Sequence, residues 1–394
     1  MIRYITGGES HGKGLTAIVE GLPAGLFIDL DAINLYLSRR QGGYGRGKRM
    51  SIEKDQVDIL SGVRDGYTIG SPVSLYIENK DWKSWQGAMD PFHIIPGRAV
   101  TMPRPGHADL AGGIKYDQHD LRNVLERASA RETAVRTAVG ALTSLLLREL
   151  GMGLYSYVVS IGSVGIPPGI LPMKTVGDGY LKRLSRTAAS DGRMMNIPDA
   201  RTSAQAVALI EDTGKKGDTL GGVFEIRATN VPVGLGSYSQ WDRKLDGRLA
   251  RAMMSIQAIK AVEVGDGVMN SGRHGSDAHD EIFFSARKGL YRKTNRAGGI
   301  EGGVSNGEEI VVRAYMKPIS TLYRPLHSVD VRTKRPVRAT VERSDVCAVP
   351  AASIVGEAVV AAELASAVVE KFGGDTMKEL RKNYSAYAAY VKGY

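Results

Sequence analysis

The chain has 394 residues, 43% of them hydrophobic and 24% charged, which is the balance of a globular protein and excludes a disordered or fibrous chain. Its 52 lysines and arginines outnumber its 42 aspartates and glutamates, and the net charge of +10 suits nucleic acid, a membrane surface or anionic small molecules as partners. With Cys347 as its one cysteine, the chain forms no internal disulfide, and we expect a reducing, cytoplasmic location. We also expect no signal peptide and no membrane span, because no run approaches about 20 uninterrupted apolar residues.

Hydrophobic periodicity predicts the secondary structure in chain order. We expect strands at 2–6, 15–20, 73–77, 219–231 and 308–316. We expect helices at 29–40, in two runs within 119–150, and at 246–262, 352–372 and 376–392. Because strands and helices do not alternate steadily, a doubly wound parallel sheet is disfavoured and the predicted class is α+β.

No proline- or serine-rich linker divides the chain, so we predict a single domain over residues 1–394 that ends in a helical tail at 376–394. The pattern RAxxxP occurs at 227–232 and again at 313–318, which indicates either an internal pseudo-repeat or chance similarity. Tyrosines recur every three residues in the tail, at 384, 387 and 390. Such an aromatic stripe either covers a partner subunit or packs on its own subunit.

Two glycine-rich segments resemble nucleotide-binding motifs but lack their structural context. Residues 7–13 spell GxxxxGK, yet Gly14 takes the place of the required Ser or Thr, and a strand rather than a helix is expected next. The run GYGRG at 43–47 follows a helix, whereas a dinucleotide fingerprint follows a strand.

The second of these loops carries five cations within eleven residues. They are Arg39, Arg40, Arg46, Lys48 and Arg49. Guanidinium groups bind phosphate and carboxylate oxygens in pairs, so the loop is predicted to bind an anion, and a solvated basic face is the alternative.

Two histidines have similar settings, His11 in GESHG and His107 in PGHAD. With a reference pKa of about 6.5, each can exchange a proton at neutral pH, although a histidine with a purely structural role is the alternative. The polar run RHGSDAHD at 273–280 matches no zinc spacing, so we predict a polar loop there and no metal site.

Eight motifs of this sequence resemble segments of the chorismate synthase family and extend over nearly the whole chain. They are GESHG (8–12), RRxGGYGRGxRM (39–50), RPGHAD (104–109), LERASARET (125–133), SIQAIKAVEVGDG (255–267), GGVSNG (302–307), MKPIST (316–321) and ERSDVCAVPAA (342–352). The departures from the family pattern, Val304 and Ser320, remove no functional group.

The resemblance implies a lyase of the shikimate pathway, which catalyses the anti-1,4 elimination of phosphate from 5-enolpyruvylshikimate 3-phosphate to give chorismate. It implies a requirement for reduced FMN, with NADPH as one candidate reductant, a β-α-β sandwich of antiparallel sheets flanking helices, and a homotetramer. The partner is then a small anionic substrate, neither nucleic acid nor membrane. A nucleic-acid binder would instead show strongly salt-dependent association, and a metal-dependent phosphohydrolase would lose activity to a chelator.

The same resemblance assigns roles to individual residues. Of the catalytic residues, His11 would protonate the departing phosphate, His107 would lie near the flavin N1, and Asp345 would help the flavin N5 to remove the C6 proton. Residues that bind the substrate or NADP would be Arg40, Arg46, Arg49 and Arg131. Residues that bind FMN would be Arg127, Ala128, Ser129, Gln257, Ala258, Gly302, Lys317, Pro318, Ile319, Ser320, Thr321 and Arg343, of which the last reaches either flavin or substrate.

Overall fold

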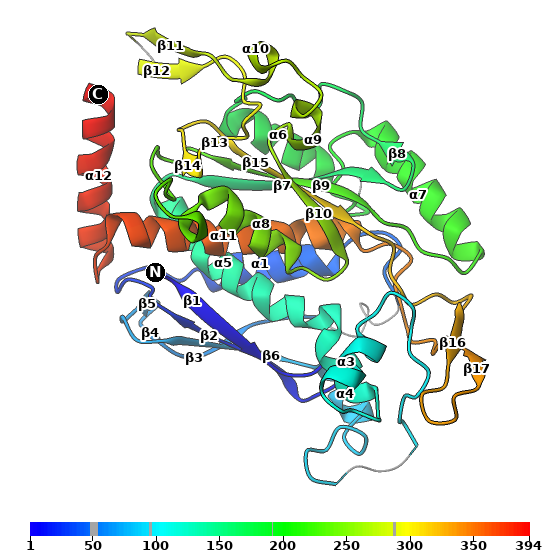
Figure 1. The fold of residues 1–394 in the computed structure, drawn as a ribbon. Helices are drawn as coiled ribbons and strands as arrows, with labels where there is room; N and C mark the ends of the chain where they lie inside the picture. The colour runs from blue at the N-terminus through cyan, green and yellow to red at the C-terminus, as the bar shows by residue number, and fades with distance from the viewer. Residues whose placement is uncertain (48–53, 94–96, 191, 287–288) are drawn as a thin grey trace.

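Two antiparallel sheets and a group of helices between them form the frame of the molecule (Figure 1). The structure is a computed structural model that describes residues 1–47, 54–93, 97–190, 192–286 and 289–394. The first sheet has the order β1 (Arg3–Gly7), β2 (Gly14–Glu20), β6 (Val73–Glu78), β3 (Asp58–Ser61). The second has the order β10 (Ile259–Val264), β15 (Ile310–Met316), β9 (Gly222–Thr229), β7 (Gly153–Ile161), β8 (Val164–Gly165). The mixture of helices with antiparallel sheets confirms the predicted α+β class.

Three helices lie between the two sheets in Figure 1: α1 (Leu30–Gln41), α5 (Thr133–Glu149) and α11 (Val349–Phe372). Helix α11 is apolar on all sides and almost wholly buried, as expected of a helix surrounded by protein. By length and composition it could cross a membrane, but 94% of its most apolar window is buried inside the molecule. Helices α5 and α11 approach so closely that a Cβ atom added to Gly140 would lie 2.2 Å from the carbonyl oxygen of Ala358.

The remaining elements surround this frame. The helices are α3 (Asp109–Lys115), α4 (Arg122–Ala128), α6 (Asp178–Ala189), α7 (Ala200–Lys215), α8 (Leu245–Met254), α9 (Gly267–Asn270), α10 (Gly275–Ala278) and α12 (Met377–Gly393). The short 3₁₀ helices are η1 (Lys80–Ser84), η2 (Ala130–Glu132) and η3 (Trp241–Arg243). The short strands are β4 (Val63–Arg64), β5 (Tyr67–Thr68), β11 (Ile282–Ser285), β12 (Gly289–Arg292), β13 (Ile300–Glu301), β14 (Val304–Ser305), β16 (His327–Val329) and β17 (Pro336–Arg338).

Most of the predicted elements are present, and the expected helix at 246–262 is the main error. Helix α8 ends at Met254, and strand β10 occupies 259–264. Between them Ala258 has a φ of 67°, a left-handed conformation that no helix contains. The alternating run IKAVEV then pairs with β15, some fifty residues further along the chain. Local hydrophobic periodicity gives no information about such a distant partner.

The two RAxxxP copies lie on neighbouring antiparallel strands of the second sheet. Arg227 on β9 and Arg313 on β15 both donate to the buried Glu225 carboxylate, at 2.7 and 2.6 Å between nitrogen and oxygen. The repeated arginines therefore share one buried counter-ion.

The helical tail α12 begins with a capping box in which Thr376 and Glu379 bind each other's backbone. Two of its tyrosines pack on the same subunit, because the rings of Tyr384 and Tyr387 lie edge-on to Phe372 at centroid distances of 5.1 and 5.6 Å. Tyr390 is 60% exposed. Tyr384 and Tyr387 of the stripe thus pack within the subunit, whereas Tyr390 remains exposed to solvent.

Candidate active site

The motif segments converge on one cavity of about 430 Å³ beside the N-terminal half of α11. Its wall contains the three predicted catalytic residues, His11, His107 and Asp345. Of the residues predicted to bind substrate or flavin, the wall contains Arg40, Arg46, Arg131, Ala128, Ser129, Gln257, Ala258, Lys317, Ile319, Ser320, Thr321 and Arg343. Residues from distant parts of the chain therefore form a single site.

Arg40 and Arg131 share the carboxylate of Asp55 on one side of the cavity. Arg131 Nη1 lies 2.7 and 2.8 Å from the two Asp55 oxygens, and Arg40 Nη1 lies 3.4 Å from Oδ2. All three side chains are at most 5% exposed. Burial lowers the pKa of Arg40 to about 9, with the neighbouring Arg131 and Arg46 acting in the same direction and Asp55 opposing them. Arg40 remains charged at neutral pH, so two guanidinium groups share the single negative charge of Asp55.

Two further arginines of the cavity wall are paired with aspartates. Arg46 Nη1 lies 3.1 Å from Asp345 Oδ2, and the backbone N–H of Gly47 donates to Asp345 Oδ1 at 2.6 Å. Arg343 Nη2 donates to Asp81 Oδ2 at 2.5 Å. Asp345 thus lies in the cavity as the counter-ion of Arg46.

The five cations of the glycine-rich loop do not all point to the same place in the structure. Arg40 and Arg46 line the cavity, whereas Arg39 points into the helical layer and donates to both oxygens of Glu357 on α11, at 3.0 and 2.8 Å. Lys48 and Arg49 lie outside the described residues. The prediction of an anion-binding face thus does not hold for Arg39, because a buried carboxylate on α11 binds it.

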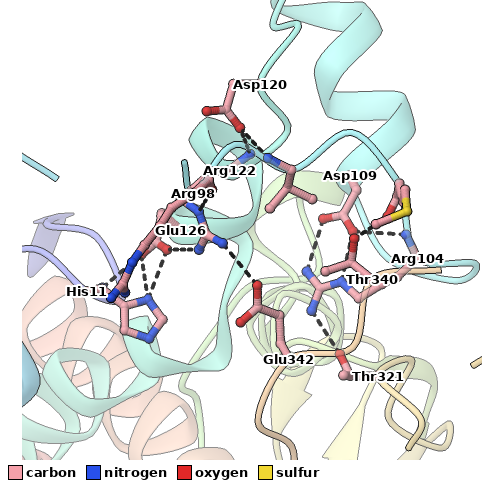
Figure 2. A network of polar contacts seen from close by, with 12 residues as sticks. His11, Arg98, Arg104, Asp109, Asp120, Arg122, Glu126, Thr321, Thr340 and Glu342 are labelled. Carbon is pink, nitrogen blue, oxygen red and sulfur yellow. Dashed lines mark hydrogen bonds and ion pairs between the residues drawn. The ribbon is translucent and has the colours of Figure 1, made fainter. Parts of the chain in front are cut away.

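His11 lies in the loop between β1 and β2 and is bound by Glu126 of α4 (Figure 2). The ring Nδ1 lies 2.9 Å from Glu126 Oε1, and the backbone N–H of His11 donates to Oε2 at 2.8 Å. The His11 ring stacks on Trp85 with centroids 4.0 Å apart. The ring is therefore fixed on two sides.

His107 has a similar partner, since its Nδ1 lies 2.6 Å from Asp109 Oδ1. Arg104 donates to Asp109 Oδ2 at 2.8 Å and to the Thr321 hydroxyl at 2.8 Å, which joins the RPGHAD and MKPIST segments (Figure 2). Burial disfavours the Asp109 carboxylate, but its hydrogen bonds to His107 and Arg104 outweigh burial and hold its pKa well below the ordinary value of 3.8. Asp109 is therefore ionised at neutral pH.

Three residues predicted to contact FMN lie outside this wall: Arg127, Gly302 and Pro318. The Arg127 guanidinium donates to the carbonyls of Thr6 and Gly8, both at 3.1 Å, and so fixes the start of the His11 loop. Gly302 forms the tight turn between β13 and β14 with a φ of 59°. Arg127 and Gly302 thus have a local structural use in the subunit.

Five residues that contact the predicted site residues were not themselves predicted from the sequence. They are Asp55, Trp85, Arg104, Asp109 and Glu126. Arg104 and Asp109 lie in the RPGHAD motif and Glu126 lies in the LERASARET motif, so their place in these motifs could have identified them as site residues. Asp55 and Trp85 have no such signal, because only the fold brings them to the site. Among the described residues no group of three or more His, Cys, Asp or Glu could hold a metal ion, and this includes the polar loop 273–280.

A cavity with paired arginines, two histidine–carboxylate pairs and an apolar part of its wall is typical of an enzyme that acts on an anionic small molecule. The family model for chorismate synthase matches residues 2–369. A chorismate synthase from Desulforamulus reducens is 54% identical over 394 residues, and one from Geobacter sulfurreducens is 55% identical over 403, each match covering 100% of both chains. A crystal structure of chorismate synthase aligns at 44% identity with a TM-score of 0.76, covering 100% of this chain and 99% of that chain.

The chain belongs to the chorismate synthase family. It is accordingly an enzyme, a carbon–oxygen lyase of the shikimate pathway, and its elimination reaction produces chorismate for aromatic amino acid biosynthesis.

Proposed function

We propose that the protein eliminates phosphate from 5-enolpyruvylshikimate 3-phosphate by an anti-1,4 route and requires reduced FMN to do so. The observation that carries this proposal is the single cavity that joins five arginines to His11, His107 and Asp345. The substrate has one phosphate and two carboxylates, and arginine recognises both kinds of anion through paired hydrogen bonds.

The charge balance of the cavity supports an anionic ligand. Of the five arginines in the wall, those at positions 40, 46, 131 and 343 share only three aspartates, at positions 55, 81 and 345. The fifth, Arg104, is paired with Asp109, and the wall carboxylate of Glu342 is paired with Arg122. Lys317 adds a further cation to the wall. Because buried like charges repel one another, a bound phosphate or carboxylate would stabilise this arrangement. We propose Arg40, Arg46 and Arg131 as the substrate or NADP ligands, and Arg49 as a fourth that lies outside the described residues.

The apolar part of the cavity wall fits a flavin. Leu125, Ile256, Ala352 and Val355 provide apolar surface for a flat ring. Nearby, the buried Gln257 Oε1 has no hydrogen-bond partner among the described residues. A buried acceptor is costly to leave unpaired, and a ring N–H would satisfy it. Ala128, Ser129, Ala258 and residues 317–321 would complete the site, and bound reduced FMN would supply electron density to the substrate; NADPH is a candidate reductant.

The proton transfers are assigned to three residues of the wall. His11 would donate a proton to the phosphate oxygen as the carbon–oxygen bond breaks, which makes the phosphate a better leaving group. Asp345 would help to accept the C6 proton, and this requires its contact with Arg46 to loosen when the substrate carboxylates bind. His107, oriented by Asp109, would donate to the flavin and stabilise its reduced form.

Three further proposals concern the whole protein. We propose that the helices between the two sheets form the middle layer of a β-α-β sandwich, that the enzyme is a cytoplasmic homotetramer, and that its partners include neither nucleic acid nor membrane. The exposed Tyr390 at the end of the aromatic stripe supports a subunit contact by α12.

Product analysis tests the proposed reaction. Purified protein with substrate and reduced FMN is expected to release chorismate and phosphate in equal amounts, and a chelator should leave the rate unchanged. Phosphate release without chorismate, abolished by the chelator, would instead identify a metal-dependent phosphohydrolase.

A further inference from the structure

The carboxylate of Glu126 contacts His11 more extensively than a structural ion pair requires. Its two oxygens lie 2.9 and 3.1 Å from the ring Nδ1, and Oε2 also accepts the His11 backbone N–H at 2.8 Å (Figure 2). The Glu126 side chain is fully buried, and the His11 side chain is 11% exposed. The two residues are 115 positions apart, so the fold and not the local chain creates this contact.

The Glu126 carboxylate is itself held in place by Arg122. Arg122 donates to Glu126 Oε1 at 3.2 Å and to Glu342 Oε1 at 3.1 Å (Figure 2). The guanidinium groups of Arg98 and Arg122 lie over the Trp85 ring at 4.1 and 5.0 Å, and His11 stacks on that ring. The plane of the imidazole and the position of its carboxylate partner are thus fixed by two buried residues, Trp85 and Arg122.

This arrangement determines which ring nitrogen exchanges protons. An ionised carboxylate only accepts hydrogen bonds, so Nδ1 carries a hydrogen and donates it to Glu126. Burial raises the pKa of Glu126, but the hydrogen bonds and charge of His11 together with Arg122 bring it below the ordinary value, which keeps the carboxylate ionised. Proton exchange with a ligand in the cavity is then left to the other nitrogen, Nε2.

We propose that Glu126 is a positioning residue for His11, which keeps the hydrogen on Nδ1 and so directs the Nε2 proton to the leaving group. The inference rests on the proposed function, in which His11 protonates the departing phosphate. As the carbon–oxygen bond breaks, its electron pair goes to the phosphate oxygen, which takes the Nε2 proton. The ring is left neutral with its hydrogen on Nδ1, still bound to Glu126, and Glu126 itself gains no proton.

Kinetics of Glu126→Gln, His11→Ala and the double variant test this role. Glu126→Gln is expected to lower kcat at least about tenfold, since loss of the orienting carboxylate in a serine-protease triad costs about 10⁴-fold. The KM for substrate should change less than about threefold, because Glu126 acts on the proton transfer and not on binding. In the His11→Ala background, Glu126→Gln should not lower kcat any further. A further loss of kcat of about tenfold or more in the double variant would overturn the proposal.

The matched control is Glu363→Gln, which removes another glutamate–arginine pair, with Arg248 at 2.6 Å, on α11. It should lower thermal stability and leave kcat unchanged, and an equal loss of kcat in this variant would show that general destabilisation explains the effect. Should Glu126→Gln not fold, Glu126→Asp replaces it: the retained charge on a shorter side chain should preserve KM and lower kcat. Wild-type kcat in either Glu126 variant would refute the positioning role.

A spectroscopic measurement separates this proposal from the function on which it rests. In protein with ¹⁵N-labelled histidine, the His11 signals, identified by their loss in His11→Ala, should show hydrogen on Nδ1, and Glu126→Gln should alter that state. Unchanged ¹⁵N shifts in Glu126→Gln would refute positioning even if His11 is catalytic. Near-normal turnover by His11→Ala would refute the proposed proton donor and the kinetic role of Glu126 together.

Discussion

Replacement of Asp55 by asparagine should expose how strongly the arginines of the cavity depend on a buried counter-ion. Asp55 is fully buried and binds Arg131 at 2.7 and 2.8 Å and Arg40 at 3.4 Å. The asparagine side chain would retain the shape and lose the charge, which leaves two nearly buried guanidinium groups without their shared counter-ion. Breaking a buried ion pair by removal of one partner costs about 3–5 kcal/mol. We expect the free energy of unfolding of Asp55→Asn to fall by about that amount.

Urea unfolding in chloride and in phosphate buffer measures the effect. An anion that binds only the folded protein adds stability by mass action. Phosphate should therefore restore more stability to Asp55→Asn than it adds to the wild type, because it replaces the missing negative charge between the arginines. The control is Asp58→Asn, an exposed position on β3, which should change the unfolding free energy by less than about 0.5 kcal/mol. A loss below about 1 kcal/mol for Asp55→Asn, or an equal response of both proteins to phosphate, would refute the reasoning.

The other predictions concern single side chains of the site. His107→Ala should lower turnover per folded protein at least about 10²-fold, whereas a purely structural histidine would lower the melting temperature and leave the folded enzyme active. Arg46→Ala should raise the substrate dissociation constant at least about tenfold in calorimetric titration, and an unchanged constant would show the loop to be a solvated face. The depressed pKa of Asp109 contributes stability that is complete above the ordinary value of 3.8 and is lost as pH falls below it. In acid urea titrations Asp109→Asn should therefore show a smaller loss of unfolding free energy than the wild type between about pH 5 and pH 2, and parallel curves would contradict the assignment.

The elements that could be predicted from sequence are those whose signal is local. Helix α1 begins after Asp29, whose side chain accepts the backbone N–H of Ala32 as an N-cap should, and α11 shows a continuous apolar run. Strand β10 could not be predicted, because its place is decided by pairing with β15 and by the left-handed Ala258 that ends the preceding turn. Local periodicity carries neither fact.

The site divides in the same way. The motifs marked His11, His107, Arg40, Arg46 and Arg131 as candidates, because each motif contains its own chemically active residue, and the structure brings these residues to one cavity. The residues that orient them depend on long-range contacts: Asp55 is 76 positions from Arg131, and Glu126 is 115 positions from His11. Their importance follows from burial and charge balance, which only the folded chain reveals.

Anaerobic turnover of 5-enolpyruvylshikimate 3-phosphate with reduced FMN, with oxidised FMN and with no flavin tests the central claim most directly. Chorismate should form only with reduced FMN, and the flavin should end the reaction still reduced, because the elimination is redox-neutral. Equal rates in all three conditions, or no product even with reduced FMN, would contradict the account.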